Sequence, residues 1–137
     1  MAEILADLLE NYLQKYKIWL PKEALLVPIP LHKNRERKRG FNQAKLIARH
    51  LSERLGLELA ENVLKKTKAT RPQIELRAEE RRKNLTGAFA VSDPQKIQNK
   101  IILLLDDVKT TGTTLEEAAV VLKQAGAKRV WAITVAH

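Results

Sequence analysis

The segment that decides the fold runs Ile101-Ile-Leu-Leu-Leu-Asp-Asp-Val-Lys-Thr-Thr-Gly-Thr-Thr-Leu-Glu-Glu-Ala-Ala119. Its leading aliphatic residues form a short continuous apolar run, which is typical of a strand buried inside a parallel sheet. Two carboxylates follow, Asp106 and Asp107, and then a loop of small hydroxyl residues around Gly112. Apolar residues at helical spacing begin at Leu115. The segment therefore predicts a strand, a polar loop and a helix in immediate succession.

The rest of the chain repeats this alternation of apolar runs and amphipathic stretches. Strand–helix–strand order predicts an α/β fold with a mostly parallel central sheet flanked by helices, together with an N-terminal helix. The 137 residues fit a single domain, 1–137, with 1–20 as a helical extension. Gly56 and Gly126 are suited to end the second and third helices. We expect helices at 3–16, 42–55 and 115–125, strands at 24–29, within 57–64, and at 87–91, 101–105 and 130–135, and a turn at 93–94.

The polar loop has the properties of a phosphate site. Ligands of open α/β sheets bind beyond the carboxyl ends of the strands, and a helix N-terminus offers free backbone N–H groups to an anion. Gly112 lets the backbone approach a ligand closely, and the threonine hydroxyls can donate hydrogen bonds. The predicted phosphate loop consists of Lys109, Thr110, Thr111, Gly112, Thr113 and Thr114.

Asp106 and Asp107 stand where this loop begins. Carboxylates accept hydrogen bonds from sugar hydroxyls and bind Mg²⁺ directly or through water. Consecutive strand residues point to opposite faces, so we expect the chain to turn at once, allowing both to reach one ligand. Phosphate next to hydroxyl-binding carboxylates indicates a ribose 5-phosphate.

A purely structural interpretation of the same residues exists. Thr113 with Glu116, and Thr114 with Glu117, each match a helix capping box. Taken together, however, the apolar strand, the paired aspartates and the Thr-Thr-Gly-Thr-Thr loop favour a ligand site. The chain contains neither GxxxxGK[ST] nor GxGxxG, which excludes the two commonest alternative phosphate motifs.

Two further segments are rich in basic residues. The loop after the first strand includes Lys33, Arg37 and Arg39, and its guanidinium groups suit pyrophosphate oxygens. The stretch 65–83 includes Arg81 and Arg82. That stretch is either a solvated loop, a segment that closes over substrate, or a contact for DNA phosphates. Trp19 and Trp131 are interpreted as packing residues.

Composition narrows the class of protein. The net charge of +9 suits a polyanionic partner such as nucleic acid, nucleotide or pyrophosphate. There is no Cys, and the three His are not at metal-ligand spacing, so no metal site by Cys or His ligation is expected. Charges interrupt the apolar pattern of the first twenty residues, unlike a signal peptide, and no run is long enough for a membrane span. We expect a cytoplasmic protein without membrane insertion.

Three motifs carry a family resemblance. The stretch from Leu103 to Thr114 resembles the phosphoribosyl-pyrophosphate (PRPP) motif of type I phosphoribosyltransferases. The stretches 27–44 (VPIPLHK…RKRGFNQA) and 73–89 (Q…L…RRKNLTGAF) resemble the ComF-type competence proteins, relatives of the amidophosphoribosyltransferases. The resemblance covers about residues 24–136. ComF proteins usually carry an N-terminal cysteine zinc ribbon, whereas this chain has no Cys, so no zinc is expected.

The resemblance implies roles for these residues. Asp106 and Asp107 would contact the ribose hydroxyls and 110–114 would hold the 5-phosphate. The loop 30–40 would face the pyrophosphate, and 65–83 would correspond to the flexible active-site loop.

The resemblance also implies an activity. It is Mg²⁺-dependent transfer of ribose 5-phosphate from PRPP to an acceptor that the sequence does not identify, linked to DNA uptake and natural competence. A PRPP- or nucleotide-sensing protein without turnover, and a single-stranded-DNA-binding accessory protein, stay open as alternatives. Expected partners are PRPP or a phosphoribosyl nucleotide, and single-stranded DNA or the competence machinery. The Leu/Tyr stripe of the first helix can pack on its own domain or on a second copy in a homodimer.

Overall fold

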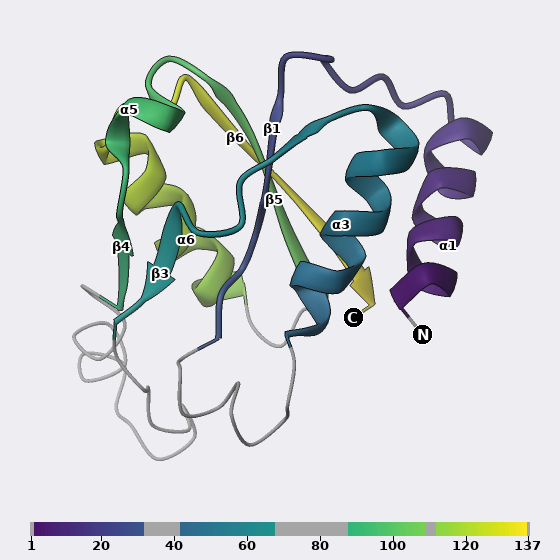
Figure 1. Cartoon of the computed structure of the whole chain (residues 1–137), viewed down its shortest axis with the longest axis horizontal. Helices are drawn as coiled ribbons and strands as arrows, with labels where there is room; N and C mark the ends of the chain where they lie inside the picture. The colour runs from purple at the N-terminus through teal and green to yellow at the C-terminus, as the bar shows by residue number, and fades with distance from the viewer. Residues whose placement is uncertain (1, 32–41, 68–87, 109–111, 137) are drawn as a thin grey trace.

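A computed structural model of the 137-residue chain describes residues 2–31, 42–67, 88–108 and 112–136. Four parallel strands form its central sheet in the order β2-β1-β5-β6 (Figure 1). This sheet confirms the predicted α/β class. The strands are β1 Leu25–Pro28, β2 Glu58–Leu59, β5 Ile101–Val108 and β6 Arg129–Ala136.

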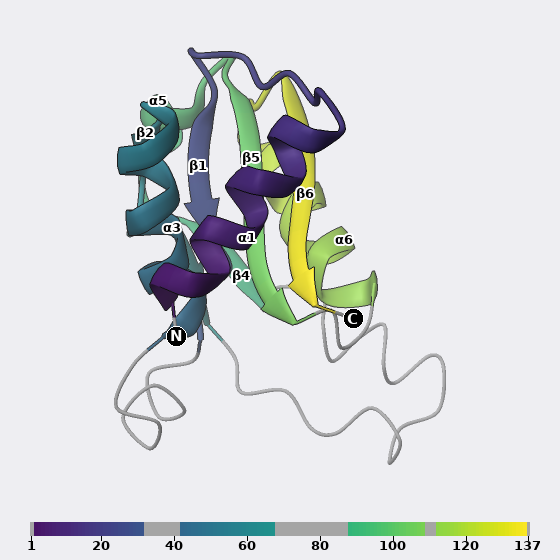
Figure 2. The same cartoon turned by 90° about the vertical axis from the view of Figure 1, so that its right-hand side faces the viewer.

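Helices cover both faces of the sheet (Figures 1 and 2). On one face lie α1 (Ala2–Lys15) and α3 (Gln43–Leu55), and on the other lies α6 (Gly112–Gln124). The N-terminal helix is therefore confirmed. None of the helices in the described ranges is long and apolar enough to cross a membrane.

The central strand β5 alternates its side chains between two cores. Ile102 and Leu104 pack on the α6 side, and Leu103 and Leu105 pack on the side of α1 and α3. All four are fully buried, and burial of each such side chain contributes about 1.5–3 kcal/mol. The continuous apolar run of the sequence thus reflects a strand covered on both faces.

A small second sheet and a short helix complete the α6 side. The strands β3 (Leu64–Lys66) and β4 (Phe89–Val91) pair antiparallel, and α5 (Pro94–Ile97) follows. Phe89 and Ile97 are buried in the core beneath α6. The turn predicted at 93–94 is wrong, because Pro94 occupies the start of a helix, where its missing N–H and fixed φ are tolerated.

Two helices end at the glycines that the sequence predicts, Gly56 and Gly126. Asn42 is the N-cap of α3, and Gly56 ends that helix in the left-handed region with φ 67°. Gly126 follows α6 with φ 114°. The strand β5 is longer than predicted: it continues to Val108, which pairs with Ala136 of β6. The expected turn immediately after Leu105 is therefore wrong, and the chain stays extended through both aspartates.

The two tryptophans also differ from expectation. Trp19 is 74% exposed and Trp131 is 36% exposed, so neither is a core residue.

Candidate functional site

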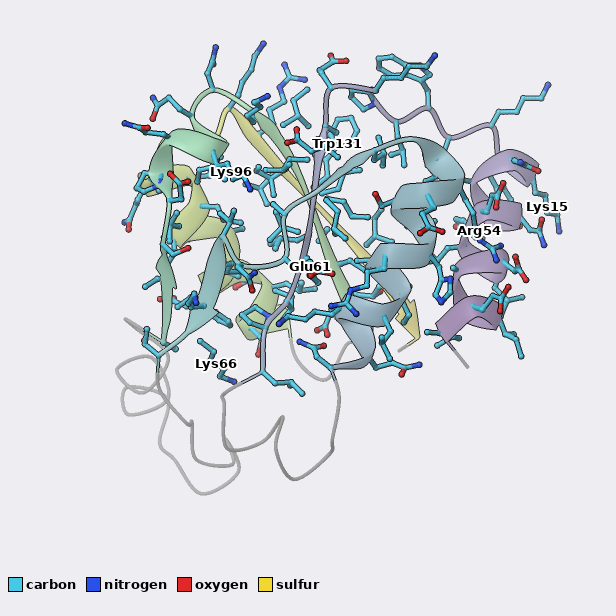
Figure 3. The ribbon with its side chains drawn as sticks, in the orientation of Figure 1. Lys15, Arg54, Glu61, Lys66, Lys96 and Trp131 are labelled. Atoms are coloured by element: carbon cyan, nitrogen blue, oxygen red, sulfur yellow. The ribbon has the colours of Figure 1, made fainter. Side chains whose placement is uncertain are left out.

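The described residues that flank the predicted ligand-binding segments lie together at one edge of the molecule. The parallel strands β1, β5 and β6 all end there, and α3 and α6 begin there, at the lower end of Figures 1 and 2. The small sheet brings its open end to the same place, where Lys66 is labelled in Figure 3. This is the carboxyl edge of a parallel sheet, where α/β folds bind ligands.

Asp106 lies at this edge on the central strand. It pairs in register with Thr134 of β6 and is half-buried. Strand alternation places it in the same row as Ile102 and Leu104, which face α6. Asp106 therefore lies on the face of the sheet that α6 covers, beyond the last apolar residue of its row.

The N-terminus of α6 lies close to that carboxylate. Only residues 109–111 separate Val108, the end of β5, from Gly112, the first residue of α6. Four steps of extended chain span at most about 14 Å, so the helix must begin within that distance of the strand end. A helix of 13 residues has a full set of free N–H groups and a partial positive charge at its start. The arrangement places a helix N-terminus, of the kind that can bind an anion, near the carboxylate of Asp106.

The start of α6 also bears on the capping-box interpretation of the threonines. Because the helix begins at Gly112, Thr113 and Thr114 lie inside its first turn. A capping box requires the threonine just before the helix, so neither capping-box match of the sequence is realised. Thr114 is half-buried, and Leu115 packs against the core beneath α6.

The segment 32–41 starts and ends at fixed points of this edge. The amide of Ile29 donates to the carbonyl of Leu105 at 2.8 Å, which ties the end of β1 to β5. The Nδ2 of Asn42 donates to the carbonyl of Ile29 at 3.2 Å, and its Oδ1 accepts from the amide of Lys45 at 3.4 Å. One side chain thus joins the strand end to the helix start.

The residues that flank the segment 68–87 are likewise joined by a hydrogen bond. The amide of Thr67 donates to the carbonyl of Ala88 at 2.6 Å. Lys65 and Lys66, which the sequence assigns to the active-site loop, belong to β3 instead. The sequence reasoning overlooked Asn42 and the Thr67–Ala88 pair as anchors. For Asn42 a signal existed, since an asparagine directly before an apolar helical pattern is a typical N-cap.

The structure shows the predicted site residues to different extents. The side chains of Asp106 and Thr114 are described, and they belong to neighbouring elements at the same edge. Asp107, Gly112 and Thr113 are placed in strand or helix by their backbone only. The remaining predictions lie outside the described residues, namely Lys33, Arg37, Arg39, Arg81, Arg82, Lys109, Thr110 and Thr111.

Two arginines of α3, Arg49 and Arg54, form ion pairs with described carboxylates. Arg49 of α3 pairs with Glu61, and this bidentate contact lowers the pKa of Glu61 and raises that of Arg49. Arg54 contacts three acids of α1. Among the described residues no three His, Asp or Glu side chains form a cluster suited to a metal ion. A cavity of about 710 Å³ between α1 and β6 is lined mainly by apolar residues.

The fold and this edge define a class of protein, namely a parallel α/β protein with a helix N-terminus beside a strand end that carries a carboxylate. The sequence agrees with that class, since residues 37–137 match the family described as "Phosphoribosyl transferase domain". The match covers the strand β5, the loop after it and α6. The chain belongs to this family.

Individual relatives bear out the resemblance of the sequence motifs. The chain is 32% identical over 136 residues to Competence protein F of Haemophilus influenzae, covering 97% of this chain and 58% of that protein. It is 34% identical over 137 residues to the DNA utilization protein YhgH of Salmonella typhi, covering 97% of this chain and 60% of that protein. The chain thus spans about three fifths of the length of these relatives.

A solved structure shares the fold. The allosteric regulatory enzyme of purine biosynthesis superposes with a TM-score of 0.60 at 18% identity, covering 98% of this chain and 25% of that one. At this identity the similarity shows the fold alone.

Proposed function

We propose that the chain binds PRPP at the carboxyl edge of its sheet and transfers ribose 5-phosphate to an acceptor. The observation that carries this proposal is the position of the α6 N-terminus, within a few residues of Asp106 on the strand β5. Membership of the phosphoribosyl transferase domain family supports the same substrate class.

Each part of the edge would hold one part of the ligand. The α6 N-terminus, with Lys109 and 110–114, would bind the 5-phosphate through backbone N–H groups and hydroxyls. Asp106 and Asp107 would accept hydrogen bonds from the ribose hydroxyls. The pyrophosphate would face the segments that carry Lys33, Arg37, Arg39, Arg81 and Arg82, whose flanking residues meet at this edge.

The residues also fit the metal that this substrate requires. Oxygen ligands such as the half-buried carboxylate of Asp106 are those that Mg²⁺ prefers. Bound with PRPP, Mg²⁺ would offset the charge of the pyrophosphate as it leaves.

The proposed reaction breaks one bond and forms another at the same carbon. The bond between C1 of the ribose and the pyrophosphate oxygen breaks, and its electron pair leaves with pyrophosphate. A lone pair of the acceptor, which we propose is a nitrogen, forms the new bond to C1, and the acceptor loses a proton to solvent. The chain's contribution is to position the two reactants and stabilise the leaving charge.

A second candidate function, binding of single-stranded DNA, is favoured by a separate observation. The relatives are named for competence and DNA utilization. Lys96, Lys100, Lys128 and Arg129 are exposed and make no ion pair within the described part of the chain. These cations lie at the opposite edge of the sheet, so DNA could bind there while PRPP occupies the carboxyl edge. We propose a role in natural competence on this basis.

The test of the main proposal is thermal unfolding with and without PRPP at a fixed Mg²⁺ concentration. PRPP at about 100 times its dissociation constant should stabilise the wild type by about 2.7 kcal/mol, which is roughly 5–10 °C. The double variant Asp106→Asn/Asp107→Asn should lose this shift. The matched control is Asp93→Asn, the same chemical change before α5 at the far edge, and it should keep the shift.

Each result leads to a defined conclusion. A shift that the double variant loses supports the site, and release of pyrophosphate with candidate acceptors then separates an enzyme from a sensor. No shift for the wild type at millimolar PRPP, or an equal shift in the double variant, refutes the proposed site. Binding of labelled single-stranded DNA, with its salt dependence and competition by PRPP, tests the second candidate independently.

A further inference from the structure

The helix α1 has two apolar sides, and only one of them is buried. Its inner side is buried through Ala2, Ala6, Leu9 and Leu13, and Ala2 and Leu9 belong to the core shared with α3 and the sheet. Its outer side carries exposed apolar residues at four-residue spacing, and Leu8 among them is 57% exposed. These residues are Ile4, Leu8, Tyr12 and, just beyond the helix, Tyr16. A helix that only covers its own domain needs a single apolar stripe.

An apolar groove runs between this outer side and the strand β6. It has a volume of about 710 Å³, and none of its lining residues is charged. Leu8, Tyr12 and Ile18 form one wall, and Leu103, Trp131 and Ile133 form the other wall and the floor. Trp131 is labelled on β6 in Figure 3. An exposed apolar surface of this extent on a chain with 30% charged residues indicates an interface.

The strand β6 adds an unpaired edge to this surface. Within the described sheet, β6 is the last strand and pairs only with β5. Between Val130 and Ala136 it contains no charged residue and no proline, the features that usually protect an edge from pairing. Within the described sheet, the outer N–H and C=O groups of β6 thus have no partner strand.

The acidic residues of α1 lie on its other flank, whereas Lys15 lies over the ring of Tyr16. Arg54 of α3 contacts Glu3 at 3.7 Å, Glu10 at 3.6 Å and also Asp7, as its position between the two helices in Figure 3 indicates. These acids are therefore engaged on the α3 side. The flank that borders the groove keeps its apolar character.

We propose that this surface is the interface of a homodimer, with a second copy of the chain as its occupant. Under a two-fold axis, β6 would pair antiparallel with its mate, and the exposed aromatic residues of each copy would fill the groove of the other. The surface is suited to itself because it combines a hollow with protruding aromatic side chains.

The available area agrees with a stable dimer. Counting about 200 Å² for a full aromatic side chain and somewhat less for an aliphatic one, the exposed portions total roughly 500 Å² per copy. A standard interface buries about 800 Å² per partner, and the strand edge and groove walls would supply the rest. The side chains counted are Ile4, Leu8, Tyr12, Tyr16, Ile18 and Trp131.

The net charge predicts how salt affects this dimer. Two copies of a chain with charge +9 repel each other, whereas the groove itself contains no charge. Added salt screens the repulsion and leaves the apolar contact intact, so dimerisation should strengthen as salt rises. A complex held together by bound nucleic acid would weaken instead.

Sedimentation of the full chain after nuclease treatment tests the proposal, at about 1–200 µM protein and at low and high salt. The wild type should form a dimer that tightens with salt. Leu8→Glu and Trp131→Lys should each raise the dimer dissociation constant about 100-fold. The matched control is Val120→Glu, which places the same charge at an exposed apolar position of α6, 48% exposed, and should change it less than about 2-fold.

Circular dichroism shows whether each variant is folded, and exposed Leu8 should tolerate the change. The proposal is overturned if the folded wild type stays monomeric throughout. It is also overturned if Leu8→Glu and Trp131→Lys weaken the dimer no more than Val120→Glu does, or if the dimer weakens as salt rises. The proposal does not depend on the PRPP site, so either can fail alone.

Discussion

The side-chain amide of Asn42 ties the end of β1 to the start of α3. Its Nδ2 donates to the carbonyl of Ile29 at 3.2 Å, and its Oδ1 caps the helix by accepting from the amide of Lys45 at 3.4 Å. Asn42 is 4% exposed and is the one fully buried polar residue of the described chain. This side chain therefore joins the residues that flank the segment 32–41. The basic residues of that segment lie outside the part of the chain that the structure describes.

Replacing Asn42 by Ala should destabilise the chain by about 2 kcal/mol, because a helix cap is lost and the buried carbonyl of Ile29 loses a partner. The melting temperature should fall by about 8 °C. Asn42→Asp distinguishes the two contacts, since Asp keeps the capping oxygen but turns a second oxygen toward the carbonyl of Ile29. Thermal unfolding should find Asp no better than Ala. A variant with Asp as stable as the wild type would show that the bond to Ile29 contributes little.

Asp106 should contribute to binding of the sugar and not of the phosphate, if PRPP binds as proposed. Asp106→Asn should weaken binding of ribose 5-phosphate about 10-fold, the usual effect of losing a charge-assisted hydrogen bond. Binding of inorganic phosphate at the α6 N-terminus should be unchanged or slightly stronger. Calorimetric titration with both ligands measures the difference, and Asp93→Asn is the control. Equal weakening for both ligands would contradict separate sugar and phosphate contacts.

Much of the fold follows from the sequence because the strands and helices carry strong local signals. The strand β5 is a continuous aliphatic run, and α3 has an amphipathic stripe that ends at Gly56. Where a local sequence pattern is compatible with two structures, tertiary packing determines which of them forms. The dipeptide Asp93-Pro94 starts a helix because Ile97 is buried in the core beneath α6. Pairing with β6 keeps β5 extended through Asp106 to Val108, a tertiary effect that periodicity does not contain.

The candidate site was predictable in part for a similar reason. Asp106 and the α6 N-terminus are neighbours in sequence, so one motif locates both. The convergence of β1, β3 and β4 on the same edge depends on strand order and on single bonds such as Thr67 to Ala88. The exposure of Trp19 and Trp131 was missed because aromatic residues are usually buried, and a surface that faces a partner looks like a core in sequence.

A glycine is required at position 126 because of the backbone conformation there and not because of crowding by neighbouring side chains. Its φ of 114° is unfavourable for any residue with a side chain, although the atom nearest to an added Cβ is only the movable Oε1 of Gln98, at 2.4 Å. Gly126→Ala should cost about 2 kcal/mol of strain, and adding Gln98→Ala should recover little of it. Gly56→Ala, at φ 67° with open space around it, should cost about 1 kcal/mol. Urea unfolding measures the free energy of unfolding of all three variants. Full recovery of stability when Gln98→Ala is added to Gly126→Ala would show that the contact with Gln98 dominates over backbone strain.

The pair Arg49–Glu61 should stabilise the chain at neutral pH and lose its effect in acid. Hydrogen bonds from Arg49 lower the pKa of Glu61, so the folded chain holds this carboxylate in its charged form more readily than the unfolded chain does. The contribution is therefore complete above the ordinary pKa of Glu and disappears as the pH falls through the lowered value. Because Arg49 is half exposed, the contribution of the pair to stability should be less than about 1 kcal/mol.

Urea unfolding of Glu61→Gln against the wild type should show this difference in stability at pH 7 and none once the carboxylate is protonated. Glu58→Gln, an exposed position on β2, is the control and should differ from the wild type at neither pH. A loss of stability in Glu61→Gln that persists unchanged in acid would mean that Glu61 acts through packing and not through its charge.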